Sequence, residues 1–273
     1  MSVDLLVSSW RREHATQESW LIRIPSAMYA TLGTLVLVLL WWRGSALGSW
    51  DDLILPGPGS VLEELGALAR TQQFWSDIGV TCWEVSLSLV LGCVLGLVLG
   101  AIFWWFPLLG RSLESYVVSF YTVPLIVLYP VMIVIFGISP WSLIVLNTVV
   151  VLIPVLLNVW IGLEETPRGY LKLGQAMRCS GFRVLFRIAL PSASRQVAAG
   201  VQIAVSVAIS AAVGMEFLMA PQGLGFRVRY YYESLENESM LAYILTLFIL
   251  AVMIVGLVTW LQKLVLRTLH VGA

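Results

Sequence analysis

Residues 164–191 read EETPRGYLKLGQAMRCSGFRVLFRIALP, a long polar interruption in the second half of an otherwise apolar sequence. Around residues 174–186, apolar side chains such as Met177 recur at helical spacing beside basic ones such as Arg178. A hydrophobic span begins directly after Pro191. A basic amphipathic segment between two membrane spans either lies on lipid headgroups or docks a soluble partner, and we favour docking.

The composition is that of a membrane protein. The chain has 273 residues, of which 59% are hydrophobic and 12% charged, with a mean hydropathy of +0.89. Ordinary soluble domains carry about 25% charged residues. The three cysteines show no CxxC spacing, so neither a disulfide scaffold nor a metal cluster is expected. The first apolar segment starts near Pro25 behind a mixed-charge leader, which favours an uncleaved first span over a signal peptide.

We therefore predict an all-α integral membrane protein with six transmembrane helices. A cytoplasmic N-terminal segment, residues 1–25, precedes one transmembrane domain, residues 26–273, whose spans four and five are joined by a cytoplasmic coupling loop, residues 164–191. The spans are expected at about 26–47, 78–106, 115–138, 140–163, 194–219 and 240–266.

Small residues and prolines predict how these spans pack. Gly92, Gly96 and Gly100 repeat every four residues in span two and favour close approach of another helix. Pro124 and Pro130 interrupt span three and predict either a kink or a bend beside a pathway. Span five carries small residues on two nearly opposite faces, which predicts a place near the centre of the assembly.

The distribution of basic residues predicts the orientation. With six spans, twelve lysines and arginines fall on the side of the termini and the 164–191 loop, and four (Arg43, Arg70, Arg227 and Arg229) fall on the other side. The side richer in basic residues is cytoplasmic. Both termini and the loop are thus expected in the cytoplasm, with the chain in the inner or plasma membrane.

No motif for catalysis is present in the sequence. It contains no GxxxxGK[ST], HExxH or GxSxG, and its two histidines, His14 and His270, lie near the termini. An intramembrane enzyme would need a nucleophile with a base, or a metal set, inside the spans. We expect no enzyme activity, no metal and no cofactor in this chain.

Buried polar residues are the remaining candidates. Glu84 and Glu216 are the carboxylates that we place in or at the ends of spans. Glu84 either lies near the outer interface, reaching water or Arg70, or belongs to a pathway, and for Glu216 a structural or gating pair is favoured. Polar residues in spans more often form interhelical hydrogen bonds than line a path. The predicted translocation pathway comprises Glu84, Tyr121, Pro124, Tyr129, Asn147, Gln202, Ser206, Ser210 and Glu216.

The run ending in FRIALP resembles the cytoplasmic-loop signature of binding-protein-dependent ABC transporter permeases. The chain is similar in particular to the nitrate/sulfonate/taurine branch, through LPGPGSVLEEL (55–65), YTVPLIVLYPVMIVIFGIS (121–139) and GMEFLMAPQGLGF (214–226), in the matching order. One departure concerns the loop itself. Arg178 stands where the signature has glycine, and Gly181 is displaced by three residues.

The resemblance implies the transmembrane permease subunit of an ATP-driven ABC importer. Its expected partners are two ABC ATPase subunits that bind ATP and Mg, an extracytoplasmic substrate-binding protein, a second permease copy in a homodimer, and the lipid bilayer, but no nucleic acid. The residues expected to couple to the ATPase are Lys172, Gly174, Gln175, Ala176, Met177, Arg178, Cys179, Ser180, Gly181 and Phe182.

Two further expectations concern the cargo and the alternative function. No Lys or Arg falls in the middle of a predicted span, since Arg43, Arg195 and Lys263 lie within a few residues of the span ends, and this favours a neutral, zwitterionic or cationic cargo over an anion. The alternative is an ion-coupled carrier or channel that acts without an ATPase, with Glu84 and Glu216 as coupling groups. A membrane enzyme or scaffold is disfavoured by the missing catalytic set.

Overall fold

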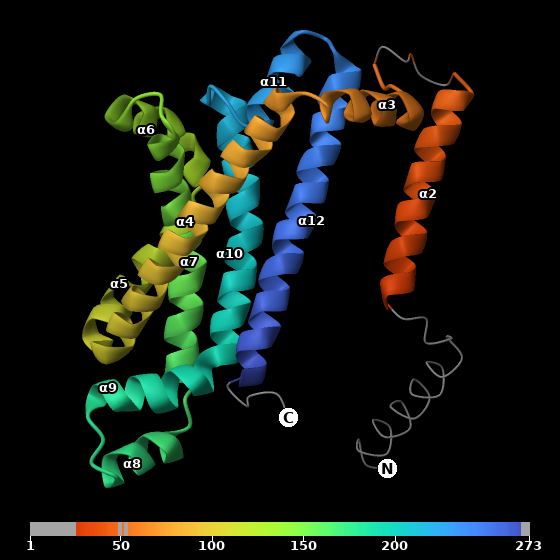
Figure 1. Ribbon diagram of the computed structural model, residues 1–273. Coiled ribbons are helices and arrows are strands. Elements are labelled where there is room, and N and C mark those ends of the chain that lie inside the picture. The colour runs from red at the N-terminus through yellow and green to blue at the C-terminus, as the bar shows by residue number, and fades with distance from the viewer. Residues whose placement is uncertain (1–25, 49–50, 52–53, 269–273) are drawn as a thin grey trace, which may run out of the picture. The chain divides into compact units, whose positions relative to one another are not determined.

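The computed structural model describes residues 26–48, 51 and 54–268, so the predicted segment 1–25 lies outside the described residues (Figure 1). This described part is helical and contains no β-strand. The chain divides into two compact units, residues 1–60 and 61–273.

The first unit contains α2 (Ser26–Ala46). The indole Nε1 of Trp41 donates a hydrogen bond to the Pro56 carbonyl at 3.1 Å, which ties the end of the helix to the segment after it. The apolar stretch of this helix whose side chains the structure describes, Leu32–Ala46, is shorter than a full span. The first of the six spans therefore stays a prediction. Helix α3 (Pro58–Leu68) begins in this unit and continues into the second.

In the second unit, α4 (Gln72–Trp105) packs closely against α7 (Pro140–Glu164). Thr71 caps α4 by accepting the Phe74 N–H at 3.3 Å, so the helix starts earlier than residue 78. A Cβ atom added at Gly96 would lie 2.7 Å from the Val155 Cβ atom. The predicted packing role of the small residues in span two is confirmed.

Helix α7 lies at the centre of this unit, and the predicted place of span five near the centre of the assembly stays a prediction. In the most apolar stretch of α7, 67% of the residues are buried, against 28% in the helix that runs from Gly181 to Met219. Within that helix, α10 (Leu190–Met219) buries one small-residue face at Ala204 and Ala208. On its other face, Ser206 and Ser210 are exposed in the single chain, whereas Gly214 lies against the side chain of Ile126.

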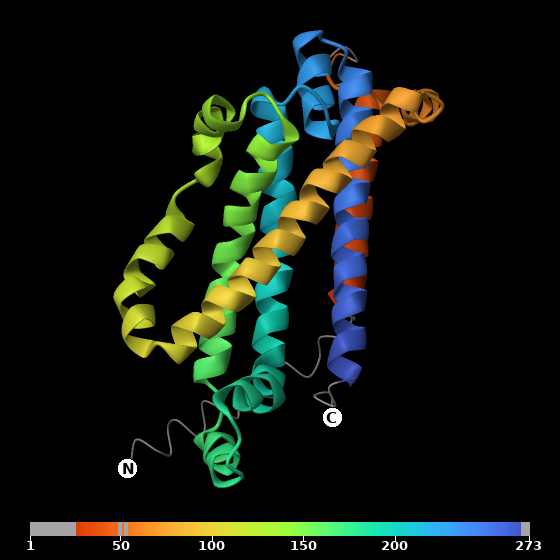
Figure 2. The same cartoon turned by 60° about the vertical axis from the view of Figure 1, so that its left-hand side comes forward.

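The predicted third span is two helices instead of one kinked helix. Helix α5 (Pro107–Thr122) is followed by a 3₁₀ turn (Leu125–Leu128) and by α6 (Tyr129–Phe136), with a bend of 82° (Figure 2). The break follows from Pro124, because proline has no N–H and holds Val123 in an extended conformation, with ψ 130°.

The remaining helices occupy the two ends of the bundle. Helices α8 (Arg168–Ala176) and α9 (Gly181–Val184) lie at one end, and α11 (Leu224–Glu233) lies at the other, from which α12 (Asn237–Thr268) runs back along the bundle (Figures 1 and 2). Among the residues that the structure describes, four helices are long and apolar enough to span a membrane, or five if the α5–α6 pair counts as one span. The total of six stays a prediction.

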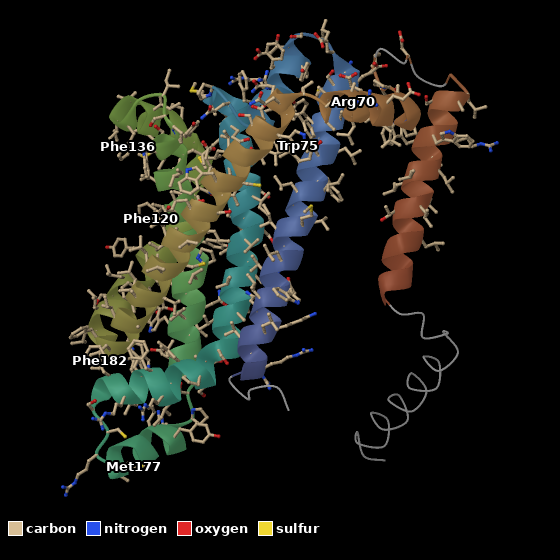
Figure 3. All side chains as sticks on the ribbon, in the orientation of Figure 1. Arg70, Trp75, Phe120, Phe136, Met177 and Phe182 are labelled. Carbon is tan, nitrogen blue, oxygen red and sulfur yellow. The ribbon has the colours of Figure 1, made fainter. Side chains whose placement is uncertain are left out.

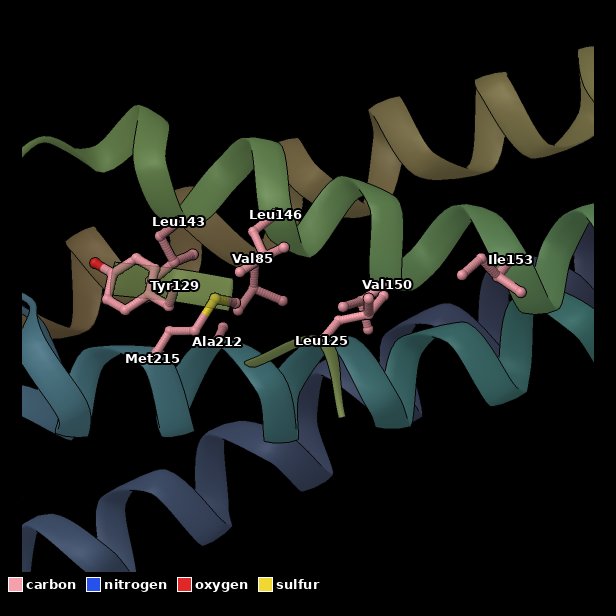
Figure 4. Packing of buried hydrophobic residues seen from close by; sticks show 9 residues of the cluster. All are labelled: Val85, Leu125, Tyr129, Leu143, Leu146, Val150, Ile153, Ala212 and Met215. Carbon is pink, nitrogen blue, oxygen red and sulfur yellow. The ribbon is translucent and has the colours of Figure 1, made fainter. Parts of the chain in front are cut away.

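One apolar cluster fills the space where α4, α6, α7 and α10 meet. Its members, shown in Figure 4, are Val85, Leu125, Tyr129, Leu143, Leu146, Val150, Ile153, Ala212 and Met215. This core places the polar side chains of α4 and α10, described next, inside protein rather than against lipid.

Candidate functional site

The stretch 164–191 leaves the bundle and returns to it as two short helices joined by a turn, and we call it the excursion. Helix α8 ends in a turn that Arg178 makes possible, with a φ of +53° in the left-handed region. The Cys179 N–H then donates to the Gly174 carbonyl at 3.0 Å, five residues back, which is the bond of a Schellman cap. The single helix predicted around 174–186 is therefore wrong, since this cap ends it.

After the turn, the chain enters the bundle as one continuous helix. Helix α9 passes through a π-helical segment (Leu185–Ala189) into α10. The Leu190 N–H donates to the Leu185 carbonyl, one residue further back than in an α-helix. Pro191 follows directly and has no N–H to give, so the wider turn adjusts the backbone before the proline. Motion of the excursion is thus tied directly to α10.

The excursion is fixed to the bundle by close contacts at two glycines. A Cβ atom on Gly174 would lie 3.0 Å from Ile188 Cδ1, and one on Gly181 would lie 2.7 Å from the Trp105 ring. The rings of Trp105 and Phe182 are 5.3 Å apart between centroids. These contacts hold α8 against the π-helical segment and the turn against the end of α4.

The predicted coupling residues differ in exposure. Met177 and Phe182 are each 68% exposed, Met177 at the far end of the excursion and Phe182 on α9 beside the bundle (Figure 3). Gly174 is buried and Cys179 is half-buried, and the side chain of Gln175 lies outside the described part. The others are exposed, namely Lys172, Ala176, Arg178, Ser180 and Gly181. Exposed apolar and basic groups together form a surface that a partner can cover.

The predicted pathway residues separate into a buried group and a group at a cleft. Tyr121, Pro124 and Ser210 line a cleft of about 510 Å³ at the break between α5 and α6. Ser206 is exposed one turn before Ser210, whose hydroxyl donates to the Ser206 carbonyl at 3.1 Å. Gln202 joins two helices, because the Thr259 hydroxyl donates to its side-chain oxygen at 3.2 Å.

The buried group lies away from the cleft. Tyr129 is part of the apolar core and 2% exposed. The Asn147 side-chain amide donates to the Ser88 hydroxyl at 2.8 Å between α7 and α4, which is the interhelical use of such residues. Glu84 is 3% exposed, so the interpretation in which it reaches water or Arg70 at an interface is wrong.

Glu216 holds the connection 220–223 against the end of α10. It is fully buried, and its Oε2 accepts the Gly225 N–H at 2.7 Å. Gly223 lies against the same carboxyl group with a φ of +102°, and a Cβ atom there would come within 2.6 Å of the Glu216 Cδ. The neighbouring Leu224 N–H donates to the Thr81 hydroxyl of α4 at 2.9 Å. The connection is therefore bound to both helices.

The sequence analysis missed a buried ion pair in this region. Asp77 is 1% exposed within α4, and its Oδ2 lies 2.7 Å from the Arg227 Nε of α11. Burial alone would lower the pKa of Arg227, but the hydrogen bond and charge of Asp77 raise it above its ordinary value. Asp77, Thr81, Glu84 and Ser88 share one face of the helix, a spacing that could have revealed the pair.

The arrangement of the helices indicates the class of protein to which the chain belongs. A bundle of long apolar helices with basic residues clustered on an excursion at one end is typical of a multi-pass membrane protein. Residues 92–269 match the family described as binding-protein-dependent transport system inner membrane component. The chain belongs to this family of multi-pass membrane proteins.

Individual relatives of the chain are transport permease proteins as well. The chain is 27% identical over 263 residues to the taurine transport system permease protein TauC of Escherichia coli, covering 94% of this chain and 93% of that one. It is 28% identical over 231 residues to the formylaminopyrimidine transport permease protein ThiX of Halalkalibacterium halodurans, covering 85% and 92%. A chain of the inward-facing MetNI methionine ABC transporter has the same fold, with a TM-score of 0.60, 22% identity, and coverage of 71% and 94%.

Proposed function

We propose that this chain is the transmembrane permease subunit of an ATP-driven importer for a small solute. In this assembly, partner ATPase subunits bind ATP and Mg, and the excursion docks on them from the cytoplasmic side. An extracytoplasmic binding protein delivers the solute at the opposite end, where α11 lies. Both termini then face the cytoplasm, on the side that carries twelve of the sixteen basic residues.

The observation that carries this proposal is the construction of the excursion. Met177 and Phe182 are large apolar groups, each 68% exposed, on a segment too charged to enter lipid deeply. The same segment continues into α10 without a break. An exposed apolar anchor is suited to a partner's groove. A continuous helix behind it is suited to carrying that partner's motion into the bundle.

The second permease copy would complete the pathway. The cleft of about 510 Å³ is open and is lined by α5, α7 and α10. Beside it, Ser206 and Ser210 leave the second small-residue face of α10 exposed. A second copy of the chain placed over this face would convert the open cleft into an enclosed path between two subunits.

The cleft also bears on the cargo. Its polar groups are uncharged, with hydroxyl groups from Tyr121, Thr122 and Ser210 and no Lys or Arg among its lining residues. We therefore propose a neutral or zwitterionic solute, of which the taurine named for one relative is an example. Glu84 does not line the cleft and takes no part in this argument. Uptake of taurine that survives an excess of nitrate supports the proposal, and displacement of taurine by nitrate contradicts it.

Docking can be tested by co-purification with the ATPase subunit encoded beside this chain. Met177→Asp and Phe182→Asp place a charge where we propose an apolar anchor, so each should abolish recovery of the ATPase. Leu235→Asp is the matched control. Leu235 is also apolar and exposed, at 80%, but it lies in the turn before α12, at the other end of the bundle.

ATP-driven uptake in proteoliposomes should be lost in both excursion variants, because uptake requires the bound ATPase. Retention of the ATPase by Met177→Asp and Phe182→Asp would contradict the docking site. Solute uptake by the purified chain alone, driven by an ion gradient, would contradict the importer and support the ion-coupled carrier.

A further inference from the structure

The mechanism proposed above leaves one buried group unused, the pair of carboxyl groups of Glu84 and Glu216. They come from α4 and α10 and lie within hydrogen-bonding reach of each other. Glu84 is 3% exposed and Glu216 is fully buried. Two acidic side chains in contact inside a membrane protein are costly if both are ionised.

The hydrogen bonds of the pair are incomplete if neither group carries a proton. Glu216 Oε2 accepts the Gly225 N–H, and the Thr81 hydroxyl lies within reach of the same carboxyl group, but Glu216 Oε1 and Glu84 Oε2 are buried without a hydrogen-bond partner. A carboxylate can only accept hydrogen bonds, so two facing carboxylates cannot satisfy each other. One proton between them supplies the missing donor and removes one of the two negative charges.

No neighbouring cation replaces that proton among the described residues. Arg227 pairs with Asp77, and Arg229 donates to the Leu218 and Ala220 carbonyls. Neither arginine forms an ion pair with Glu84 or Glu216. The other titratable groups that act on the pair, Asp77 and Cys82 of α4 and Tyr129 of α6, are acids and provide no positive charge.

We propose that Glu84 and Glu216 form a proton-binding site, in which one shared proton holds the connection 220–223 and the start of α11 against α4. Glu216 binds the connection through Gly225, and Glu84 extends from α4, so the proton joins the two sides. When the proton leaves, the two carboxylates repel each other. The Thr81–Leu224 hydrogen bond across the same junction is then weakened. The site does not depend on the identity of the cargo or the ATPase.

The first test is an infrared pH titration of the purified full-length chain in detergent micelles. A shared proton gives the C=O stretching band of a protonated carboxyl group near neutral pH, and this band should vanish at alkaline pH. The band should be absent from Glu84→Gln, because the glutamine amide donates a hydrogen bond to Glu216 and no titratable proton is needed. It should be retained in Glu114→Gln, which removes an exposed carboxyl group. Absence of the band from the wild-type chain at neutral pH would overturn the proposal.

The second test is thermal unfolding as a function of pH. Burial and contact make the folded state hold a proton that the unfolded chain releases, so the contribution to stability is present at low pH and is lost as pH rises. We expect the wild-type Tm to fall by about 3–5 °C per pH unit over the interval in which the proton leaves. Glu84→Gln should flatten this dependence, whereas Glu114→Gln should retain it.

Glu84→Lys provides a variant in which a fixed positive charge replaces the proton. It should fold with a Tm that is insensitive to pH over the same interval, because the lysine ammonium pairs with Glu216. Parallel pH profiles for the wild-type chain and both Glu84 variants would overturn the proposal. Recovery of the alkaline wild-type Tm on adding Na⁺ or K⁺ would assign the site to a metal cation instead.

Discussion

Replacement of Gly96 by alanine should destabilise the bundle, although alanine is normally the better helix residue. Gly96 lies in the middle of the α4–α7 contact. A Cβ atom there would be 2.7 Å from the Val155 Cβ atom, 2.8 Å from its Cγ1 and 3.0 Å from the Leu152 carbonyl oxygen. Two of these atoms are on or next to the backbone of α7, so a change of rotamer cannot relieve the overlap.

The magnitude follows from two opposing terms. Forcing one methyl group into a close-packed contact costs about 1–3 kcal/mol. Replacing glycine by alanine in a helix returns about 0.5–1 kcal/mol. The net loss should therefore be about 1–2 kcal/mol, which lowers the Tm by about 2–8 °C at 2–4 °C per kcal/mol.

Gly79→Ala is the control, because Gly79 belongs to the same helix and an added Cβ atom meets nothing within 4 Å. It should raise the Tm, since only the helix-propensity term remains. The assay is thermal unfolding of the purified chains in one detergent at one pH. Equal shifts for Gly96→Ala and Gly79→Ala would refute the reasoning. Val155→Gly should cost less in the Gly96→Ala background than in the wild-type chain, because it removes the atoms that overlap with the added methyl group.

Three further perturbations follow from individual contacts. Asp77→Asn should lower the free energy of unfolding by up to about 3 kcal/mol, because Arg227 loses its charged partner while the amide oxygen still accepts a hydrogen bond. An unchanged midpoint of denaturant unfolding would show that the ion pair contributes nothing to stability. Arg178→Gly should stabilise the excursion by about 1 kcal/mol, since glycine adopts positive φ without strain, and slower hydrogen exchange of the Cys179 amide would report it. Asn147→Leu should lower the free energy of unfolding by only about 0.6 kcal/mol, the average for a hydrogen bond between membrane helices. A loss of uptake without a matching loss of stability would instead favour the pathway role of Asn147.

The features that the sequence predicted well depend on local or repeating chemistry. The repeat of Gly92, Gly96 and Gly100 was sufficient to locate a packing face, because only small residues allow helices to approach this closely. Pro124 was sufficient to predict an interruption. The size of the bend, 82°, was not predicted, because the positions of α5 and α6 are also set by contacts such as that of Tyr129 with the core.

The features that it missed depend on contacts between distant segments. Arg178 adopts a conformation that usually selects glycine, and the signal for glycine lay three residues later in the sequence, at Gly181. Asp77 was left outside the second span because hydropathy alone does not reveal a carboxylate buried with Arg227, which is 150 residues away. The position of Glu84 beside Glu216 likewise required the fold, because nothing in either local sequence identifies the other as its neighbour.

The end of the excursion and Glu216 lie on one continuous helix, so a movement of the excursion can reach the carboxyl pair. Phe182 is near one end of the helix that runs from Gly181 to Met219, and Glu216 is near the other. Within that helix the π-helical segment, Leu185–Ala189, is a place where the helix can change its bend. If the π-helical segment bends when the docked excursion moves, Glu216 stays in place. If the segment does not bend, the movement passes along α10 and shifts Glu216 relative to Glu84 on α4. Coupling between the ATPase and the connection 220–223 therefore depends on the stiffness of the π-helical segment. A variant that shortens this segment to a regular α-helix should change uptake without changing ATPase binding.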